Sequence, residues 1–156
     1  MITFDQLEFD IRFEWGEHGV TTLAPISDVV IIVDVLSFST SVELPARRFG
    51  RKFAVIAAGE RWKDDGSLRP SFEDMVGAGA IISWLAGAKS PEATAAEAAF
   101  RDVESKLSEA LRQCSSGKEL IAQGFANDVI LASELNVSEC APVLIDDAYR
   151  SKTGPI

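Results

Sequence analysis

The chain has 156 residues, of which 47% are hydrophobic and 25% are charged, so it is long enough for one domain with a buried core and too apolar for a disordered segment. Its formal net charge is -9, with 15 Lys and Arg against 24 Asp and Glu, which argues against a nucleic-acid partner and favours a bound cation. No apolar run approaches the roughly 20 residues that span a bilayer, no secretory signal is visible, and the two cysteines lack the spacing of a zinc site, so we expect a cytoplasmic protein without a membrane partner.

An alternation of apolar and polar residues near the N-terminus predicts a half-buried strand. Leu7, Phe9, Ile11 and Phe13 alternate with charged residues, and two glycines follow. We expect this strand to be antiparallel to its neighbour or to lie at an edge of the sheet. His18, the only histidine, falls between the two glycines and is expected to be a surface or structural residue of a turn.

Two apolar runs predict buried strands. Residues 28–36, DVVIIVDVL, form a β-branched run typical of a strand covered on both faces, and we expect it to be central. A helix should open at the Ser/Thr cluster that follows, although Pro45 interrupts it. The second strand is expected at 53–58. Since a loop and a helix follow each strand, we expect the two to be adjacent and parallel, with Asp34 and Glu60 at the same edge of the sheet.

The next segment predicts a helix built from small residues. Ser71 and Asp74 have the spacing of a capping box, and the helix should run to about Leu85. Its face at residues 77–80, GAGA, should pack unusually close to a neighbouring element.

The C-terminal half predicts further helices and a last strand. Ser90 and Pro91 open a helix through Cys114, with apolar residues spaced three or four apart. Ser116 should cap a short helix that ends at Gly124, a further helix should follow, and APVLI should form a strand. Together the elements predict one α/β domain over residues 1–156, with a mixed, largely parallel sheet flanked by helices.

Polar residues follow the first buried strand. Asp34 lies within an apolar run, where a carboxylate costs several kcal/mol unless it is paired, hydrogen-bonded or bound to a metal. Ser39 and Thr40 lead into the next helix, whose free N–H groups would favour an anion such as phosphate. Simple N-capping is the alternative interpretation of this cluster.

More charged residues follow the second strand. Glu60, Glu73 and Asp74 offer hard oxygen ligands for Mg²⁺, and Arg61 and Arg69 offer planar forks for an anionic ligand. A solvated turn at residues 64–67 and first-turn acids that satisfy a helix dipole are the alternatives, and the residues alone do not separate them.

Several motifs in order resemble one family. The stretch GERWKDDGSLRPSFEDMVGAGAII, together with VVIIVDVLSFSTS, SPEA, CSSGKELIAQGFANDVILASELNVSECAPVL and the closing DDAYR, resembles the 2-phosphosulfolactate phosphatase family, which is associated with coenzyme M biosynthesis. These motifs cover most of the chain from about Val29 to Arg150.

The resemblance implies a Mg²⁺-dependent hydrolase that converts 2-phosphosulfolactate, or a similar small anionic phosphate ester, to 3-sulfolactate and phosphate. The implied metal ligands are Asp34, Glu73 and Asp74, and the implied catalytic residues are Asp34, Glu60 and Asp74. The substrate would be bound by Ser39, Thr40, Arg61, Ser67 and Arg69.

Two departures from the family pattern bear on these expectations. Ser37 stands where the family pattern has an arginine, so one anion-binding charge is absent. Members of the family also carry a further segment that is missing here near residues 43–46, through a natural deletion, a shortened chain or an unobserved segment. The alternative function is therefore an inactive anion-binding or oligomerisation domain, and for either function we expect a homo-oligomer, a dimer.

Overall fold

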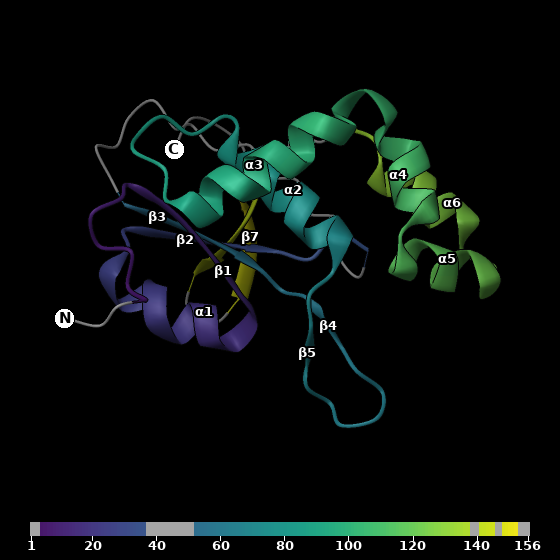
Figure 1. Cartoon of the computed structure of the whole chain (residues 1–156), viewed down its shortest axis with the longest axis horizontal. Coiled ribbons are helices and arrows are strands. Elements are labelled where there is room, and N and C mark those ends of the chain that lie inside the picture. Colours follow the sequence, from purple (N-terminus) through teal and green to yellow (C-terminus); the bar gives the residue numbers. More distant parts are fainter. Residues whose placement is uncertain (1–3, 37–51, 138–140, 146–147, 153–156) are drawn as a thin grey trace.

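The computed structural model describes residues 4–36 and 52–137, and the backbone of 141–145 and 148–152 (Figure 1). The expectations for Ser39, Thr40 and Pro45 and for the missing segment near 43–46 therefore lie outside the described residues.

Three parallel strands form the main sheet. They are β1 (Ile11–Trp15), β2 (Val29–Val33) and β3 (Phe53–Ala57), in the order β1-β3-β2. Ile11 and Val29 both lie opposite Phe53, so the two outer strands pair with β3 in the same register. The prediction that the two apolar runs form adjacent, parallel strands is confirmed, as is the α/β fold.

The prediction that residues 28–36 form the central strand is wrong. β3 holds the centre and all five of its residues are buried, whereas β2 lies at an edge of the three-stranded sheet. Val30 and Ile32 on one face of β2 are 36% and 51% exposed. A run of β-branched residues indicates a strand. Whether other elements cover both faces of that strand depends on distant parts of the sequence.

The first strand lies at an edge, as expected, but it is parallel and starts later than the alternation suggested. Leu7 precedes it and is 44% exposed. Its polar face is not solvated, because Arg12 is fully buried and donates through Nη2 to the carbonyl of Ile26 and the hydroxyl of Ser27 at 2.9 and 2.8 Å. His18 lies in a helix rather than in a turn.

Helices cover both faces of the sheet (Figure 1). On one face, α1 (Gly16–Leu23) and the short helix η1 (Ala24–Ile26) pack through Leu23 on Ala54 and Ile56. The other face packs against α2 (Phe72–Ile82) and α3 (Pro91–Val103). Because successive residues of β3 point to opposite faces, this one strand contributes to both cores.

The small residues of α2 allow a very close approach of α3, as predicted. A Cβ placed on Gly79 would lie 2.0 Å from the carbonyl oxygen of Ala96, and one placed on Gly77 would lie 2.5 Å from a methyl group of Val35. α2 is therefore held against α3 on one side and against the chain that follows β2 on the other.

The long helix predicted from residue 90 to residue 114 is divided. The Ser90 hydroxyl accepts from the N–H of Ala93 at 3.1 Å, which confirms the cap. The helix then breaks at η3 (Glu104–Lys106) before α4 (Leu107–Gln113). The apolar positions on both sides of the break are buried. The spacing of three and four residues therefore continues through the break, and this is why the sequence pattern did not predict it.

Two short helices and two hairpins complete the described chain. α5 (Ser115–Ala122) and α6 (Ala126–Ala132) lie beside α4 at one end of the molecule (Figure 1). β4 (Glu60–Arg61) pairs with β5 (Leu68–Arg69), and β6 (Ala141–Ile145) pairs antiparallel with β7 (Ala148–Lys152). The strand expected at APVLI is confirmed. No helix among the described residues is both long and apolar enough to cross a membrane.

The Gly79 contact predicts a strong effect of a single added carbon. We expect Gly79→Ala to lower the free energy of unfolding by about 2 kcal/mol, because overpacking against a backbone atom outweighs the better helix propensity of alanine. Urea denaturation measures the change. Ala98→Ser, which adds one atom on the exposed side of α3, should change stability by less than about 0.5 kcal/mol, and equal effects of the two substitutions would contradict the close contact.

Candidate functional site

The Asp74 carboxylate joins three segments of the chain. It is 3% exposed, its Oδ1 accepts from the N–H of Val35 at 2.8 Å, and its Oδ2 accepts from the N–H of Gly59 and the hydroxyl of Ser71, both at 2.8 Å. Val35 follows β2, Gly59 follows β3, and Ser71 precedes α2. The carboxyl ends of the two strands are therefore held at the same edge of the sheet, which confirms the expected placement of Asp34 and Glu60.

This arrangement corrects the predicted capping box. Ser71 occupies the N-cap position, but its side chain makes no cap hydrogen bond to the helix and donates to Asp74 instead. Burial raises the pKa of Asp74 to about 6, partly offset by the three donors, and the charge of Asp34 adds a small increase. The Asp74 carboxylate therefore accepts its hydrogen bonds from Val35, Gly59 and Ser71 and none from the N–H groups of its own helix.

The β4–β5 hairpin separates its charged residues into two sets. Glu60 lies opposite Arg69, and Arg61 lies opposite Leu68. Opposed residues of an antiparallel pair share a face and neighbouring residues alternate, so Glu60 and Arg69 lie on one face and Arg61 and Leu68 on the other.

On the first face, Arg69 and several acids surround Glu60. The Nη2 atom of Arg69 lies 3.4 Å from the hydroxyl of Ser116, and its guanidinium lies 5.6 Å from the centre of the Trp62 ring. Burial raises the pKa of Glu60; Arg69 opposes this, and the charges of three further carboxylates, Glu73, Asp34 and Glu119, add to it. The charges of residues from four separate segments therefore act on Glu60.

Glu73 is more deeply buried than a first-turn acid that serves only a helix dipole. It is 2% exposed, and its Oε2 lies 3.5 Å from the sulfur of Cys114, which can donate its one thiol proton either to this carboxylate or to the carbonyl oxygen of Leu111 at 3.1 Å. The same sulfur caps α5 by accepting from the N–H of Gly117 at 3.3 Å, so the cap predicted at Ser116 belongs to Cys114. Burial raises the pKa of the Cys114 thiol, and the charge of Glu73 contributes, which keeps the sulfur protonated as a donor.

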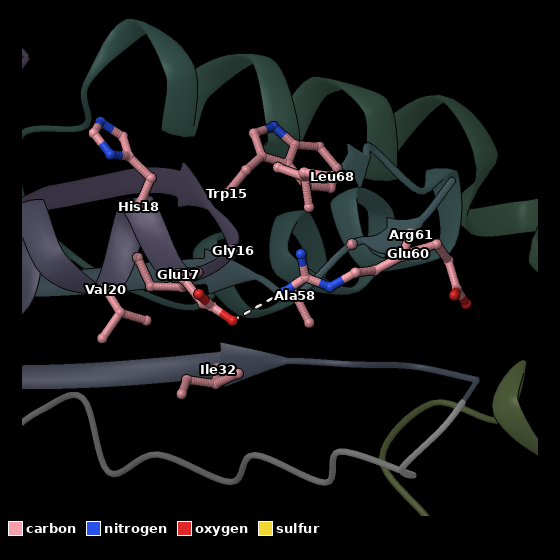
Figure 2. A pocket seen from close by; sticks show the side chains of 12 residues that line it. Trp15, Gly16, Glu17, His18, Val20, Ile32, Ala58, Glu60, Arg61 and Leu68 are labelled. Carbon is pink, nitrogen blue, oxygen red and sulfur yellow. Dashed lines mark hydrogen bonds and ion pairs between the residues drawn. The ribbon is translucent and has the colours of Figure 1, made fainter. Parts of the chain in front are cut away.

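Two cavities flank the base of the hairpin. We call the first the inner cavity; it has a volume of about 190 Å³ and is lined by Leu36, Glu60, Ser116, Glu119, Leu120 and Gln123. The second, the outer cavity, has a volume of about 420 Å³ and lies on the Arg61 side (Figure 2). Glu60 is among the lining residues of both, and its carboxylate points away from the other side chains that line the outer cavity (Figure 2).

The structure brings some of the predicted site residues together and separates others. Asp34, Glu60, Arg69, Glu73 and Asp74 gather at the carboxyl ends of β2 and β3.

Two predicted binding residues lie away from that group. Arg61 turns away and pairs with Glu17 at 2.9 Å (Figure 2). Ser67 lies in the exposed hairpin turn, where its N–H donates to Asp65, as in the alternative interpretation of a solvated turn. The two arginines therefore do not converge on one group.

Ser116, Glu119 and Cys114 line or support the site, although the sequence assigned them no role in it. The sequence predicted only a helix cap for Ser116, and it gave Glu119 and Cys114 no place in the site. The signal was present in the CSSGKEL stretch, which is one of the motifs that carry the family resemblance. A helix-cap pattern explained the same residues locally, and only the fold shows that this turn faces Glu60 and Arg69.

The acids do not form a complete metal cage. Within the part of the chain that the structure describes, no three histidine, cysteine, aspartate or glutamate side chains are grouped so that they could hold a metal ion by themselves. Mg²⁺ usually takes only one or two protein carboxylates and keeps water and substrate phosphate as its other ligands. A site of that kind would need only one or two of these carboxylates.

Comparison with known proteins points to one family. The family model described as 2-phosphosulpholactate phosphatase matches residues 50–147, which is more than half of the chain. A curated relative from Gloeobacter violaceus (strain ATCC 29082 / PCC 7421), named "Probable 2-phosphosulfolactate phosphatase", is 35% identical over 88 residues, which are 56% of this chain and 36% of the relative. The match thus spans about a third of that relative's length.

The raised pKa of Asp74 predicts a pH-dependent stability. An unfolded aspartate has a pKa near 3.9, so between about pH 4 and pH 6 the native state keeps a proton that the unfolded state has lost. Stability should therefore fall as pH rises through this window, by on the order of 3 kcal/mol from this group, and then level off. Urea denaturation from pH 4 to pH 7 should show a smaller fall in Asp74→Asn than in the wild type, and equal slopes would contradict the assignment.

Proposed function

Because the chain belongs to the 2-phosphosulfolactate phosphatase family, we propose that it is a Mg²⁺-dependent phosphatase that hydrolyses a small acidic phosphate ester, 2-phosphosulfolactate or a similar compound. The observation that carries this proposal is the setting of Glu60, which lies opposite Arg69, beside buried acids and at the wall of the inner cavity.

The inner cavity suits a phosphoryl group. Its volume of about 190 Å³ leaves room for a phosphoryl group. Arg69 lies beside the cavity rather than in its lining, with its Nη2 atom 3.4 Å from the Ser116 hydroxyl. Its planar fork can bind two phosphate oxygens at once, and Ser116, which lines the cavity, can donate to a third. Both groups lie on the same side of the hairpin as Glu60.

The same cavity explains why a cation would be needed. Glu60 and Glu119 both line it, and their charges repel a phosphate dianion. Lys63 already pairs with Glu119 at 2.5 Å, so Arg69 faces the remaining acids. A phosphate therefore enters at low cost only together with a divalent cation, and bound Mg²⁺ would neutralise the charge that develops on the phosphoryl oxygens.

We assign the acids distinct roles. Asp34 and Glu73 are the proposed Mg²⁺ ligands, and Asp74 positions the loops that carry the site, since its oxygens already accept three hydrogen bonds. Glu60 lies at the wall of the inner cavity, burial raises its pKa, and we assign it as the general acid for the leaving oxygen. Arg69 holds the phosphoryl group in place for attack by water.

The exposed face of β2 favours a second candidate function. Val30 and Ile32 expose apolar side chains next to each other on one face of an edge strand. Such a face is typical of a surface covered by another chain, which fits an anion-binding or oligomerisation domain without turnover, or a dimeric enzyme. Phosphate release from 2-phosphosulfolactate distinguishes the inactive domain from the enzyme.

We predict that Asp34→Asn lowers Mg²⁺-dependent turnover roughly 100-fold, because a hard cation loses an anionic ligand while the shape of the side chain is kept. Phosphate release is measured with Mg²⁺ and with excess chelator, and circular dichroism checks that the fold is retained. Asp64→Asn, the same change on an exposed acid of the hairpin, is the matched control and should leave turnover unchanged. Equal turnover in chelator, or full activity of Asp34→Asn, would show the metal assignment to be wrong.

Arg69→Lys should act on substrate binding instead. Lysine keeps the charge but loses the two parallel N–H donors, so we expect KM to rise roughly tenfold, with a smaller change in the Mg²⁺ concentration needed for half-maximal rate. Steady-state kinetics at varied substrate and varied Mg²⁺ separate the two quantities. A shift in the Mg²⁺ requirement without a change in KM would place Arg69 outside the phosphate site.

A further inference from the structure

The turn of the β4–β5 hairpin brings a second cation to the side of the inner cavity. The Nζ atom of Lys63 lies 2.5 Å from Oε1 of Glu119, a residue of the cavity lining. Lys63 comes after the paired residues of β4, so it does not follow the alternation that separates Arg61 from Glu60. With Arg69 beside Ser116, two positive side chains of one hairpin therefore contact the same helix, α5.

The two cations contact neighbouring positions on one face of α5. Arg69 lies beside Ser116, and Lys63 contacts Glu119, three residues later. Side chains three residues apart in a helix are neighbours, with Cβ atoms roughly 5–6 Å apart. The hydrogen bond and charge of Lys63 lower the pKa of Glu119 most, and the charge of Arg69 adds to this. The charge of Glu119 in turn raises the pKa of Glu60, so this group of charges acts across the inner cavity.

Lys63 has donors left for a ligand. An ammonium group carries three N–H donors, and within the part of the chain that the structure describes Glu119 is the one acceptor that Lys63 contacts. The Lys63 side chain is 84% exposed on a flexible stem, and an exposed ion pair contributes little to stability, so the ammonium group can reorient at small cost. Lys63 can therefore donate to an acid group in the cavity while it keeps Glu119 as a partner.

We propose that Lys63 is a specificity-determining residue, which binds the acid group of a small phosphate ester while Arg69 binds its phosphoryl group. The inference rests on the proposed phosphatase function and deepens it. In an ester whose acid group is on the carbon that bears the ester oxygen, or one carbon further, phosphorus and the acid group lie up to roughly 4–5 Å apart at about 1.5 Å for each bond. This separation is close to the spacing of Ser116 and Glu119 on α5.

Two esters of equal size isolate the acid group. Phosphoglycolate and ethyl phosphate differ only in whether a carboxylate or a methyl group ends the chain. With saturating Mg²⁺, we expect the wild type to favour phosphoglycolate in kcat/KM and Lys63→Gln to reduce that preference roughly tenfold, because a charge-assisted hydrogen bond to the carboxylate is lost. Lys63→Arg keeps a cation at this position and should retain most of the preference.

A matched control separates this contact from net charge and from hairpin stability. Lys118 is exposed on α5 next to Glu119 and does not line the inner cavity, so Lys118→Gln should leave the preference unchanged. An equal loss of preference in Lys118→Gln and Lys63→Gln would overturn the inference, because it would reflect net charge alone. The inference is also overturned if Lys63→Gln lowers kcat/KM by the same factor for both esters, since Lys63 then only ties the hairpin to α5, or if the wild type shows no preference.

Binding without turnover separates this inference from the proposed function. In 3-phosphonopropionate and propylphosphonate a CH₂ group replaces the ester oxygen of the two substrates, so neither is hydrolysed. Calorimetric titration with Mg²⁺ present should show tighter binding of 3-phosphonopropionate by the wild type, and Lys63→Gln should remove most of the difference. If neither ester is hydrolysed while this difference is found, the phosphatase proposal fails and the assignment of Lys63 stands. If the esters are hydrolysed but Lys63→Gln leaves the preference unchanged, the assignment of Lys63 fails by itself, and if there is neither hydrolysis nor binding, both fail.

Discussion

The hydrogen bonds of one buried carboxylate hold the candidate site together. Asp74 fixes the chain after β2 to the chain after β3 and to the start of α2, through the N–H groups of Val35 and Gly59 and the hydroxyl of Ser71. The two N–H groups lie two residues beyond the ends of β2 and β3, and Ser71 lies directly before α2, so neither the ladder nor the helix satisfies these donors. Without this acceptor, buried donors would lack a partner and the ends of β2 and β3 would lose their common orientation. Asp34, Glu60 and Glu73 all lie within one or two residues of this junction, so their spacing depends on it.

In the very short β4–β5 hairpin, side chains alternate between two faces, so its charged residues lie on opposite sides. With only two residues in each strand, β4 and β5 place Glu60 and Arg69 on one side and Arg61 and Leu68 on the other. The charges that look like a single anion clamp in the sequence therefore serve different surfaces. Glu60 is among the lining residues of both cavities because it lies at the base of the hairpin, next to Gly59, whose positive φ turns the chain out of β3. A shift of one residue in the register of this hairpin would exchange the two sets of side chains.

The sequence predicted those features that depend on local pattern. The buried run at β3, the Ser90 cap with Pro91, and the small-residue face of α2 each follow from the chemistry of a few neighbouring residues, and the structure confirms them. Three predictions were wrong: the central place of residues 28–36, the unbroken helix to Cys114 and the cap at Ser116. Each of these features depends on contacts with distant parts of the chain, which a local pattern does not contain. The same limit applies to the site: a pattern can collect charged residues in one stretch, but the face that each occupies is set by strand pairing and by partners such as Glu17 and Ser116.

The accumulation of buried acids is itself an argument for a ligand. Glu73 and Asp74 are each no more than 3% exposed, and Glu60 has its pKa raised by burial and by three further carboxylates, in a chain whose net charge is already -9. Burying carboxylates near one another lowers the stability of the native state, and a fold selected for stability alone would place apolar side chains there. The close packing of α2 on α3 offsets part of that cost by fixing the helix that carries two of the acids. A cation brought in with a phosphate ester would offset much of the remainder, since it turns the mutual repulsion of these groups into attraction at the point where phosphoryl transfer needs positive charge.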